Sequence, residues 1–249
     1  MFPARIDLNA DLGEGVGDDA AILPFLSSAN VACGAYAGSS RTMDVALAAA
    51  AHHGVVVGAH VGYEDREHFG RAAMSLPREE LRAAITQQIA KLQHLASRFG
   101  VAVRYVKPHG ALYHRVGVDS EQAHALLDAV RICDTQLDLL VPYSAMLHSI
   151  AHPQRCKYEF FADRAYRLNG QLVDRTEPGA VITDIEMITT RTLHWLRSGE
   201  VVSIEGKTLR IEAQSICLHG DTPHAQTIAR TLHTTLSDAG IRIAHWADA

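Results

Sequence analysis

The feature that most limits the fold is an alternation of short apolar runs with longer segments rich in alanine and leucine. Strands are predicted at residues 6–8, 30–33, 55–59, 101–106, 137–141, 158–161 and 215–218. Helices are predicted at residues 19–27, 41–53, 77–99, 120–130, 184–197 and 223–239. Alternation of this kind is typical of a parallel sheet, and about seven units favour closure into a barrel. An open doubly wound sheet is the alternative, and residues 203–211 predict a β-hairpin insertion.

Length and composition narrow the class of protein. The 249 residues contain no linker or repeat, which predicts a single domain over residues 1–249. With 23 basic and 28 acidic residues, the net charge of −5 gives no general attraction to nucleic acid. No stretch has the length and apolarity of a membrane span or a signal peptide, and the four cysteines form no CxxC pair. We expect a reduced, soluble, cytoplasmic protein with no nucleic-acid or membrane partner.

Polar side chains gather where the predicted strands end. They stand alone at His60 and Asp163, and in i, i+2 sets at Asp7, Asn9 and Asp11, at Lys107 and His109, and at His219 and Asp221. Alternate residues of a strand share one face, and the carboxyl ends of barrel strands form the usual active-site rim. One such residue is often structural, but five strands with the same pattern favour a shared polar site. A network that merely caps the barrel mouth is the alternative.

Two apparent nucleotide motifs fail on inspection. The segment GVGDDA at residues 15–20 follows a strand, but Asp11, Glu14, Asp18 and Asp19 surround it and would repel a pyrophosphate. The segment GKT at residues 206–208 lacks the earlier glycine of a P-loop, because position 201 is valine. The chain therefore has no recognisable nucleotide site of its own.

The remaining groups suit acid–base chemistry. Carboxylates serve as general bases, Lys107 can stabilise an oxyanion or a phosphate, and His60, His109 and His219 can move protons or bind a metal. No Gly-x-Ser-x-Gly elbow is present, and Cys33 is more typical of a small structural residue than of a nucleophile. The residues alone predict hydrolysis of a small polar substrate, with metal assistance as an open alternative.

Seven segments in order resemble the LamB/YcsF family of lactam-utilisation proteins, whose members are also called the A subunits of 5-oxoprolinase. They are DLNADLGE (7–14), SANVACG (28–34), GAHVGY (58–63), VKPHGALY (106–113), FADRAY (161–166), RTEPGAV (175–181) and CLHGDTP (217–223). The resemblance covers residues 6–241. It implies an α/β fold, an irregular seven-stranded (β/α) barrel of the glycoside hydrolase/deacetylase type.

The resemblance also implies an activity: the ATP-dependent opening of 5-oxo-L-proline to L-glutamate, together with partner subunits B and C. A γ-lactam amide is stable, so ring opening needs an energy input. We expect ATP to be used by the complex and not bound by a motif of this chain. The hypothesis is that the partners activate the lactam and this chain contributes to hydrolysis.

Roles are assigned by position in the chain. The predicted catalytic residues are Asp11, Glu14, His60, Lys107, His109, His219 and Asp221. The predicted substrate-binding residues are Asn9, Asn30, Tyr36, Arg71, Asp163, Arg164 and Glu177. For Arg71 and Arg164 a surface salt bridge is the competing interpretation. A metal-dependent amidase or deacetylase is the alternative enzyme, with Asp11, His60 and His109 or His219 as ligands of a divalent ion.

One departure from the family pattern bears on activity. The family usually reads ACGFHAGDP where this chain has ACGAYAGSS at residues 32–40, so Tyr36 replaces a histidine. The loop before Gly17 is also several residues shorter. Tyrosine donates a hydrogen bond but is a poor proton acceptor near neutral pH. A diverged, non-catalytic scaffold protein of the complex is therefore a further alternative.

Overall fold

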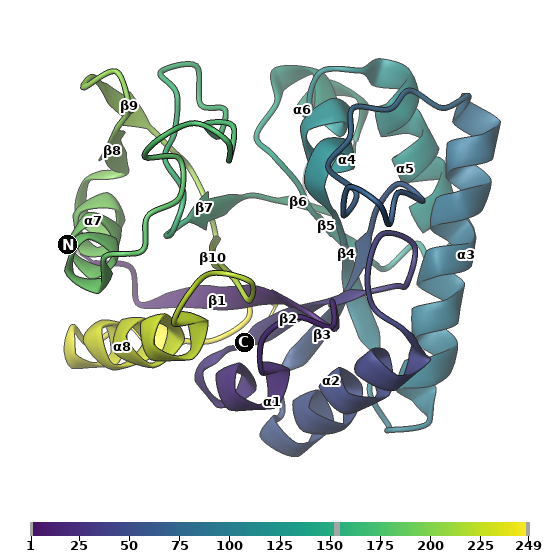
Figure 1. The fold of residues 1–249 in the computed structure, drawn as a ribbon, viewed down its shortest axis with the longest axis horizontal. Coiled ribbons are helices and arrows are strands. Elements are labelled where there is room, and N and C mark those ends of the chain that lie inside the picture. Colours follow the sequence, from purple (N-terminus) through teal and green to yellow (C-terminus); the bar gives the residue numbers. More distant parts are fainter. Residues whose placement is uncertain (1, 152–154, 248–249) are drawn as a thin grey trace.

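The computed structural model describes residues 2–151 and 155–247, and its centre is a sheet of parallel strands surrounded by helices (Figure 1). The strands are β1 (Arg5–Leu12), β2 (Ser28–Ala32), β3 (Val56–Val61), β4 (Val103–Pro108), β5 (Asp138–Leu140), β6 (Cys156–Lys157), β7 (Glu159–Phe161), β10 (Ser215–His219) and β11 (Arg242–Ile243). The helices are α1 (Asp19–Ile22), η1 (Leu23–Phe25), α2 (Ser40–His53), α3 (Arg78–Ser97), α4 (Gly110–Val116), α5 (Ser120–Cys133), α6 (Ala145–Ile150), α7 (Ile185–Ser198) and α8 (Ala225–Asp238).

The sheet curls into a nearly closed barrel. Its strands follow the order β6-β5-β4-β3-β2-β1-β10-β7, with β11 beside β1. Among the described residues the end strands β6 and β7 are not paired with each other, but only Tyr158 separates them in sequence. The chain itself therefore bridges the gap between the two sheet edges. The barrel prediction is confirmed; the predicted strands correspond to β1–β5, β7 and β10, and two-residue β6 is the additional member of the ring.

Local signals explain where most helices begin and end. Ser39 caps α2 in a reciprocal capping box with Thr42, and Gly54 ends that helix in the left-handed region at φ +67°. Asp119 and Asp184 cap the first turns of α5 and α7 through their side-chain oxygens. The helix predicted at 19–27 is wrong in extent: α1 stops at Ile22 and a 3₁₀ turn follows, because Pro24 cannot continue an α-helix.

Three features outside the barrel were predicted partly or not at all. The predicted hairpin is present, with β8 (Glu200–Val202) and β9 (Thr208–Arg210) pairing antiparallel on either side of the turn. Helices α4 and α6 were not predicted, because both are short and lack a long apolar stripe. Within the described chain, no helix combines the length and the apolarity needed to cross a bilayer.

Candidate active site at the mouth of the barrel

Polar side chains fill the inside of the barrel in a column that rises along β1. Asp7, Asn9 and Asp11 alternate along this strand and are all buried. The Asn30 amide donates to Asn9 Oδ1 (2.7 Å) and to Asp11 Oδ1 (2.8 Å), and Tyr105 donates to Asn30 Oδ1 (2.6 Å). Asn30 therefore holds the Asp11 carboxylate in place, and Asn9 in turn holds Asn30.

Lys107, near the end of β4, links the column to the opposite strands. Its Nζ lies 2.9 Å from Asp11 Oδ1, 2.9 Å from Glu159 Oε2 and 3.2 Å from Cys217 Sγ. These three partners match the three N–H groups of an ammonium, which leaves none for a substrate carbonyl in this arrangement. Burial opposes the charge of Lys107, but Asp11 and then Glu159 raise its pKa well above its ordinary value.

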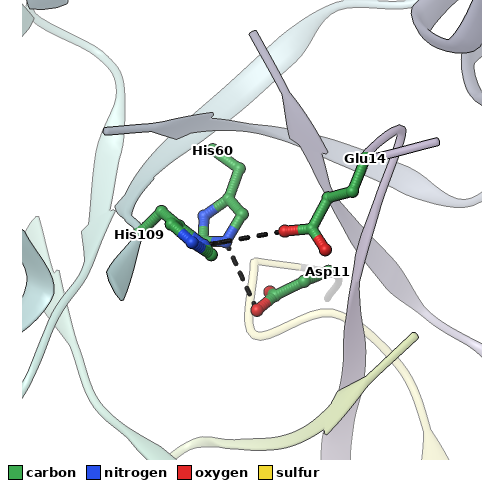
Figure 2. A group of neighbouring side chains, drawn as sticks. All are labelled: Asp11, Glu14, His60 and His109. Carbon is green, nitrogen blue, oxygen red and sulfur yellow. Dashed lines mark hydrogen bonds and ion pairs between the residues drawn. The ribbon is translucent and has the colours of Figure 1, made fainter. Parts of the chain in front are cut away.

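Four ligand-type side chains converge above Lys107. Asp11, Glu14, His60 and His109 each offer one oxygen or nitrogen, and these four atoms all lie within 4.8 Å of one another. Figure 2 shows the four side chains pointing toward a common centre, with His60 Nε2 3.3 Å from Asp11 Oδ2 and His109 Nδ1 3.6 Å from Glu14 Oε1. All four are buried.

The hydrogen bonds behind the two histidines determine which nitrogens face this centre. His60 Nδ1 lies 3.0 Å from the carbonyl oxygen of Lys107, and His109 Nε2 lies 2.9 Å from that of Phe69. A carbonyl only accepts, so both of these nitrogens carry hydrogen. The facing atoms, His60 Nε2 and His109 Nδ1, are 3.1 Å apart. In the neutral rings each of these nitrogens carries a lone pair and no hydrogen. With two carboxylates beside them, the centre requires a cation, which is either an additional proton or a metal ion.

One carboxylate of this group, Glu14, has a raised pKa. Burial, and after it the charge of Asp11, raises the pKa of Glu14 to about 8. Tyr36 donates to Glu14 Oε1 (2.9 Å) and stacks on the His109 ring at 3.7 Å between ring centres. Burial and the neighbouring His60 lower the pKa of His109 well below its ordinary value. A pKa of about 8 lets Glu14 hold the extra proton near neutral pH, whereas the lowered pKa of His109 keeps that ring neutral.

A second acid–base pair stands on the end of β10. His219 Nδ1 lies 2.9 Å from Asp163 Oδ1, and Asp163 also accepts from Thr222 (2.8 Å) and from the His219 backbone (3.1 Å). Burial would raise the pKa of Asp163, but His219 lowers it below the ordinary value. The carboxylate thus holds the ring through Nδ1, which leaves Nε2 for the cavity.

These groups line one cavity of about 370 Å³ at the carboxyl ends of the strands. Nine predicted site residues line it: Asp11, Glu14, His60, Arg71, Lys107, His109, Arg164, Glu177 and His219. Five lie behind or beside it: Asn9, Asn30, Tyr36, Asp163 and Asp221. The structure therefore brings the strand-end residues together, as the alternation along the strands predicted.

Charged side chains form the outer wall of this cavity. Asp221 lies between Arg71 (2.8 Å) and Arg175 (3.2 Å), and these arginines lower its pKa against the effect of burial. Glu177 pairs with Arg167. The structure thus places Asp221 and Glu177 in ion pairs at the rim.

Several residues of the site were missed from sequence. Glu159 is the most important, because it is a fully buried partner of Lys107; a charged residue inside the apolar run 158–161 was the available signal. Tyr113 and Arg175 also line the cavity, and both lie within segments that resemble the family. Cys33 lies outside the lining, and burial raises the pKa of its thiol to about 12, in keeping with a structural role.

Known proteins resemble this chain in both sequence and fold. A model of the LamB/YcsF family matches residues 6–249. A relative from Pseudomonas syringae pv. tomato, named as a 5-oxoprolinase A subunit, is 45% identical over 97% of both chains. The Lactam Utilization Protein from Thermus thermophilus is 38% identical with a TM-score of 0.89, over 96% of this chain and 99% of that one. A family 4 carbohydrate esterase from Streptomyces lividans shares the fold alone, with 10% identity and a TM-score of 0.51 over 98% and 94% of the two chains.

Proposed function

This chain belongs to the LamB/YcsF family, and we propose that it is the A subunit of a 5-oxoprolinase. In this role it takes part in the hydrolysis of the cyclic amide of 5-oxo-L-proline to L-glutamate. The relative from Pseudomonas syringae carries that name, and the similarity extends over nearly its whole length. The relative is named as a subunit, which supports a multi-subunit complex. We propose subunits B and C as the partners of this chain.

The observation that carries the proposal is the convergence of two acid–base centres on one cavity. Amide hydrolysis needs a base to activate water and an acid to protonate the leaving nitrogen. His219, held by Asp163, and the Asp11–Glu14–His60–His109 group both line the cavity. We assign proton exchange with a substrate bound in the cavity to His219. Glu14, whose pKa of about 8 lies near neutral pH, is the second proton-exchanging group.

Lys107 acts through Asp11 in this proposal. Its ammonium hydrogens already have three partners, so it keeps Asp11 ionised and oriented. Burial opposes ionisation of Asp11, yet His60 and Lys107 lower its pKa well below the ordinary value. The negative charge of Asp11 beside His60 then stabilises the cation of the centre, whether that cation is a proton or a metal ion.

A divalent metal ion is the specific alternative to the extra proton. The donor set fits: two imidazole nitrogens in the tautomers that ligation requires, and two carboxylates, suit Zn²⁺ or a similar ion. Asp11, Glu14, His60 and His109 would hold it, and the carbonyl oxygens of Lys107 and Phe69 would orient the two rings. Such an ion would supply Lewis-acid activation of water or of the amide oxygen. This observation also supports the metal-dependent amidase or deacetylase as the second candidate function.

The use of ATP is assigned to the complex. The sequence contains no recognisable nucleotide-binding motif, and we propose that the partners activate the lactam while this chain contributes to hydrolysis. The four cysteines are free, which fits the reducing cytoplasm where we place the assembly.

The direct test is release of glutamate from 5-oxo-L-proline by the chain with ATP and both partners. His219→Asn should lower kcat at least about 100-fold, the scale of general acid–base catalysis. His224→Asn is the matched control, because His224 is exposed and already adopts the left-handed backbone that asparagine tolerates. Ring opening by the purified chain without ATP or partners would contradict the proposed division of labour.

The metal is tested by elemental analysis of the purified chain and by calorimetric titration with Zn²⁺. Binding in the wild type that is lost in His60→Asn supports a metal centre, whereas an active, metal-free protein assigns the cation to a proton. Tyr36→His tests the scaffold alternative. That alternative is supported if the wild type and the variant are equally inactive with partners present, and it is excluded if the wild type is fully active.

A further inference from the structure

One buried cation in the cavity wall has no ionic partner. Arg164 is only 5% exposed, and it donates from Nε to the carbonyl oxygen of Ala180 (3.3 Å) and from Nη2 to that of Val173 (2.5 Å). No carboxylate in the described part of the chain forms an ion pair with it. Arginine is rarely this buried without a counter-ion in contact. Asp163 and Asp174 offset part of its charge without forming an ion pair with it, and the guanidinium lines the cavity.

The nearby charges are of both signs. Arg71 and Arg175 share Asp221, while Asp163 and Asp174 act on the charge of Arg164 without forming an ion pair with it. Asp174 also lines the cavity, but it accepts hydrogen bonds within its own turn and forms no ion pair in the described chain. Burial and the charge of Arg175 lower the pKa of Arg164 to about 10, a value at which the group stays protonated at neutral pH.

The guanidinium of Arg164 is also held in a defined orientation. Its two carbonyl partners lie on the segment between β7 and α7, and they occupy two of its five N–H groups. A planar guanidinium with free N–H groups matches a carboxylate in shape and charge. We infer that Arg164 binds the carboxylate of the lactam substrate, so the cavity selects lactam acids over neutral lactams.

This inference rests on the proposed function and names the residue that recognises the substrate's carboxylate. A lactam acid carries its carboxylate beside the ring nitrogen. Anchoring that carboxylate at Arg164 keeps the ring amide within the same small cavity as His219 and the Asp11–Glu14–His60–His109 group. One charged contact then sets both selection and orientation.

The first experiment measures turnover by the complete complex with ATP. Arg164→Lys keeps the charge but loses the planar guanidinium, and it should raise KM for 5-oxo-L-proline at least about tenfold while kcat changes less than about threefold. Arg104→Lys is the matched control, because Arg104 is exposed on β4, and its KM should equal that of the wild type. An unchanged KM in Arg164→Lys, or a loss confined to kcat, overturns the inference.

The second experiment measures binding to the isolated chain and needs no turnover. Thermal melting is followed with 5-oxo-L-proline, with 2-pyrrolidinone (the same ring without a carboxylate) and with inorganic phosphate. Only 5-oxo-L-proline should raise Tm, and Arg164→Lys should remove at least half of that rise without changing Tm in buffer by more than a few degrees. Equal rises with 2-pyrrolidinone, a larger rise with phosphate, or no rise with any probe overturns the inference.

The two experiments separate the inference from the proposed function. Suppose that the complex releases no glutamate although the isolated chain binds 5-oxo-L-proline through Arg164. This result contradicts the proposed function but supports the carboxylate site. Normal glutamate release with no selectivity between the acid and the neutral lactam contradicts the carboxylate site and leaves the function.

Discussion

Asp7 and Asp11 lie four residues apart on the same face of β1, and both are buried inside the barrel, yet their surroundings are opposite. Asp7, near the amino end of β1, accepts hydrogen bonds from the hydroxyls of Ser27 (2.7 Å), Ser28 (2.9 Å) and Ser215. No cation contacts it in the described structure. Burial raises its pKa to about 6, whereas the pKa of Asp11 is lowered because His60 and Lys107 outweigh its burial.

The difference teaches how one polar barrel interior serves two purposes. Near the amino end of β1, hydroxyl donors satisfy both carboxylate oxygens of Asp7. That hydrogen-bond network is complete and contributes to folding. At the mouth, acceptor atoms outnumber donors around Asp11 and the centre demands a cation. A complete network has no capacity for a ligand, while an incomplete one beside a cavity does.

The largest expected effect comes from removing the cation that distinguishes the two aspartates. Lys107→Met leaves Asp11 and Glu159 as buried, uncompensated carboxylates, so the free energy of unfolding should fall by about 3–5 kcal/mol. Urea denaturation measures it. Lys207→Met, in the exposed turn of the hairpin, should change stability by less than about 0.5 kcal/mol. A loss below about 1 kcal/mol in Lys107→Met would show that the ion pairs at the mouth are not needed for folding.

Exchanging each aspartate for asparagine separates function from folding. Asp11→Asn should reduce glutamate release by the complete complex about 100-fold or more, since it removes a charge from the acid–base centre. Asp7→Asn should retain activity within about threefold of the wild type, because Asp7 does not line the cavity. Similar losses in both variants would contradict the division of the barrel into two ends.

The pH dependence of stability sharpens the comparison further. The folded-state pKa of Asp7, about 6, lies above its ordinary value of 3.8, so the folded protein holds this proton more tightly than the unfolded chain. Its stabilising contribution is complete below about pH 4 and is lost as pH rises through about 6, which amounts to about 3 kcal/mol. Relative to the wild type, Asp7→Asn should therefore gain about 3 kcal/mol between pH 3 and pH 7. Parallel stability curves for the two proteins would refute the raised pKa.

The smallest effects come from a matched pair of hydroxyl deletions. Ser28→Ala removes a donor to Asp7, and Tyr36→Phe removes the donor to Glu14. Each should lower the free energy of unfolding by about 1–2 kcal/mol. Tyr36→Phe should also shift the pH profile of glutamate release, whereas Ser28→Ala should leave it unchanged. A shifted pH profile in Ser28→Ala would show that the hydrogen-bond network of Asp7 affects catalysis.

Much of the fold could be predicted because its signals are local. Apolar runs predicted the long strands, and segments rich in alanine and leucine predicted the long helices. In the structure, Ser39 and Asp119 cap two of these helices. The two-residue strand β6 carries too few residues for a pattern. The 3₁₀ turn at Pro24 replaced a predicted helical turn because proline overrides the surrounding apolar periodicity.

For the site, the sequence by itself determined which strand ends carry ionisable groups, since alternation along a strand assigns Asp7, Asn9 and Asp11 to one face. Only the tertiary structure decided their partners. Lys107 pairs with Glu159, His219 pairs with Asp163, and Arg164 forms no ion pair among the described residues, because barrel closure sets distances between segments far apart in the chain. The protonation of each buried group depends on those partners, which the order of residues along the chain does not specify.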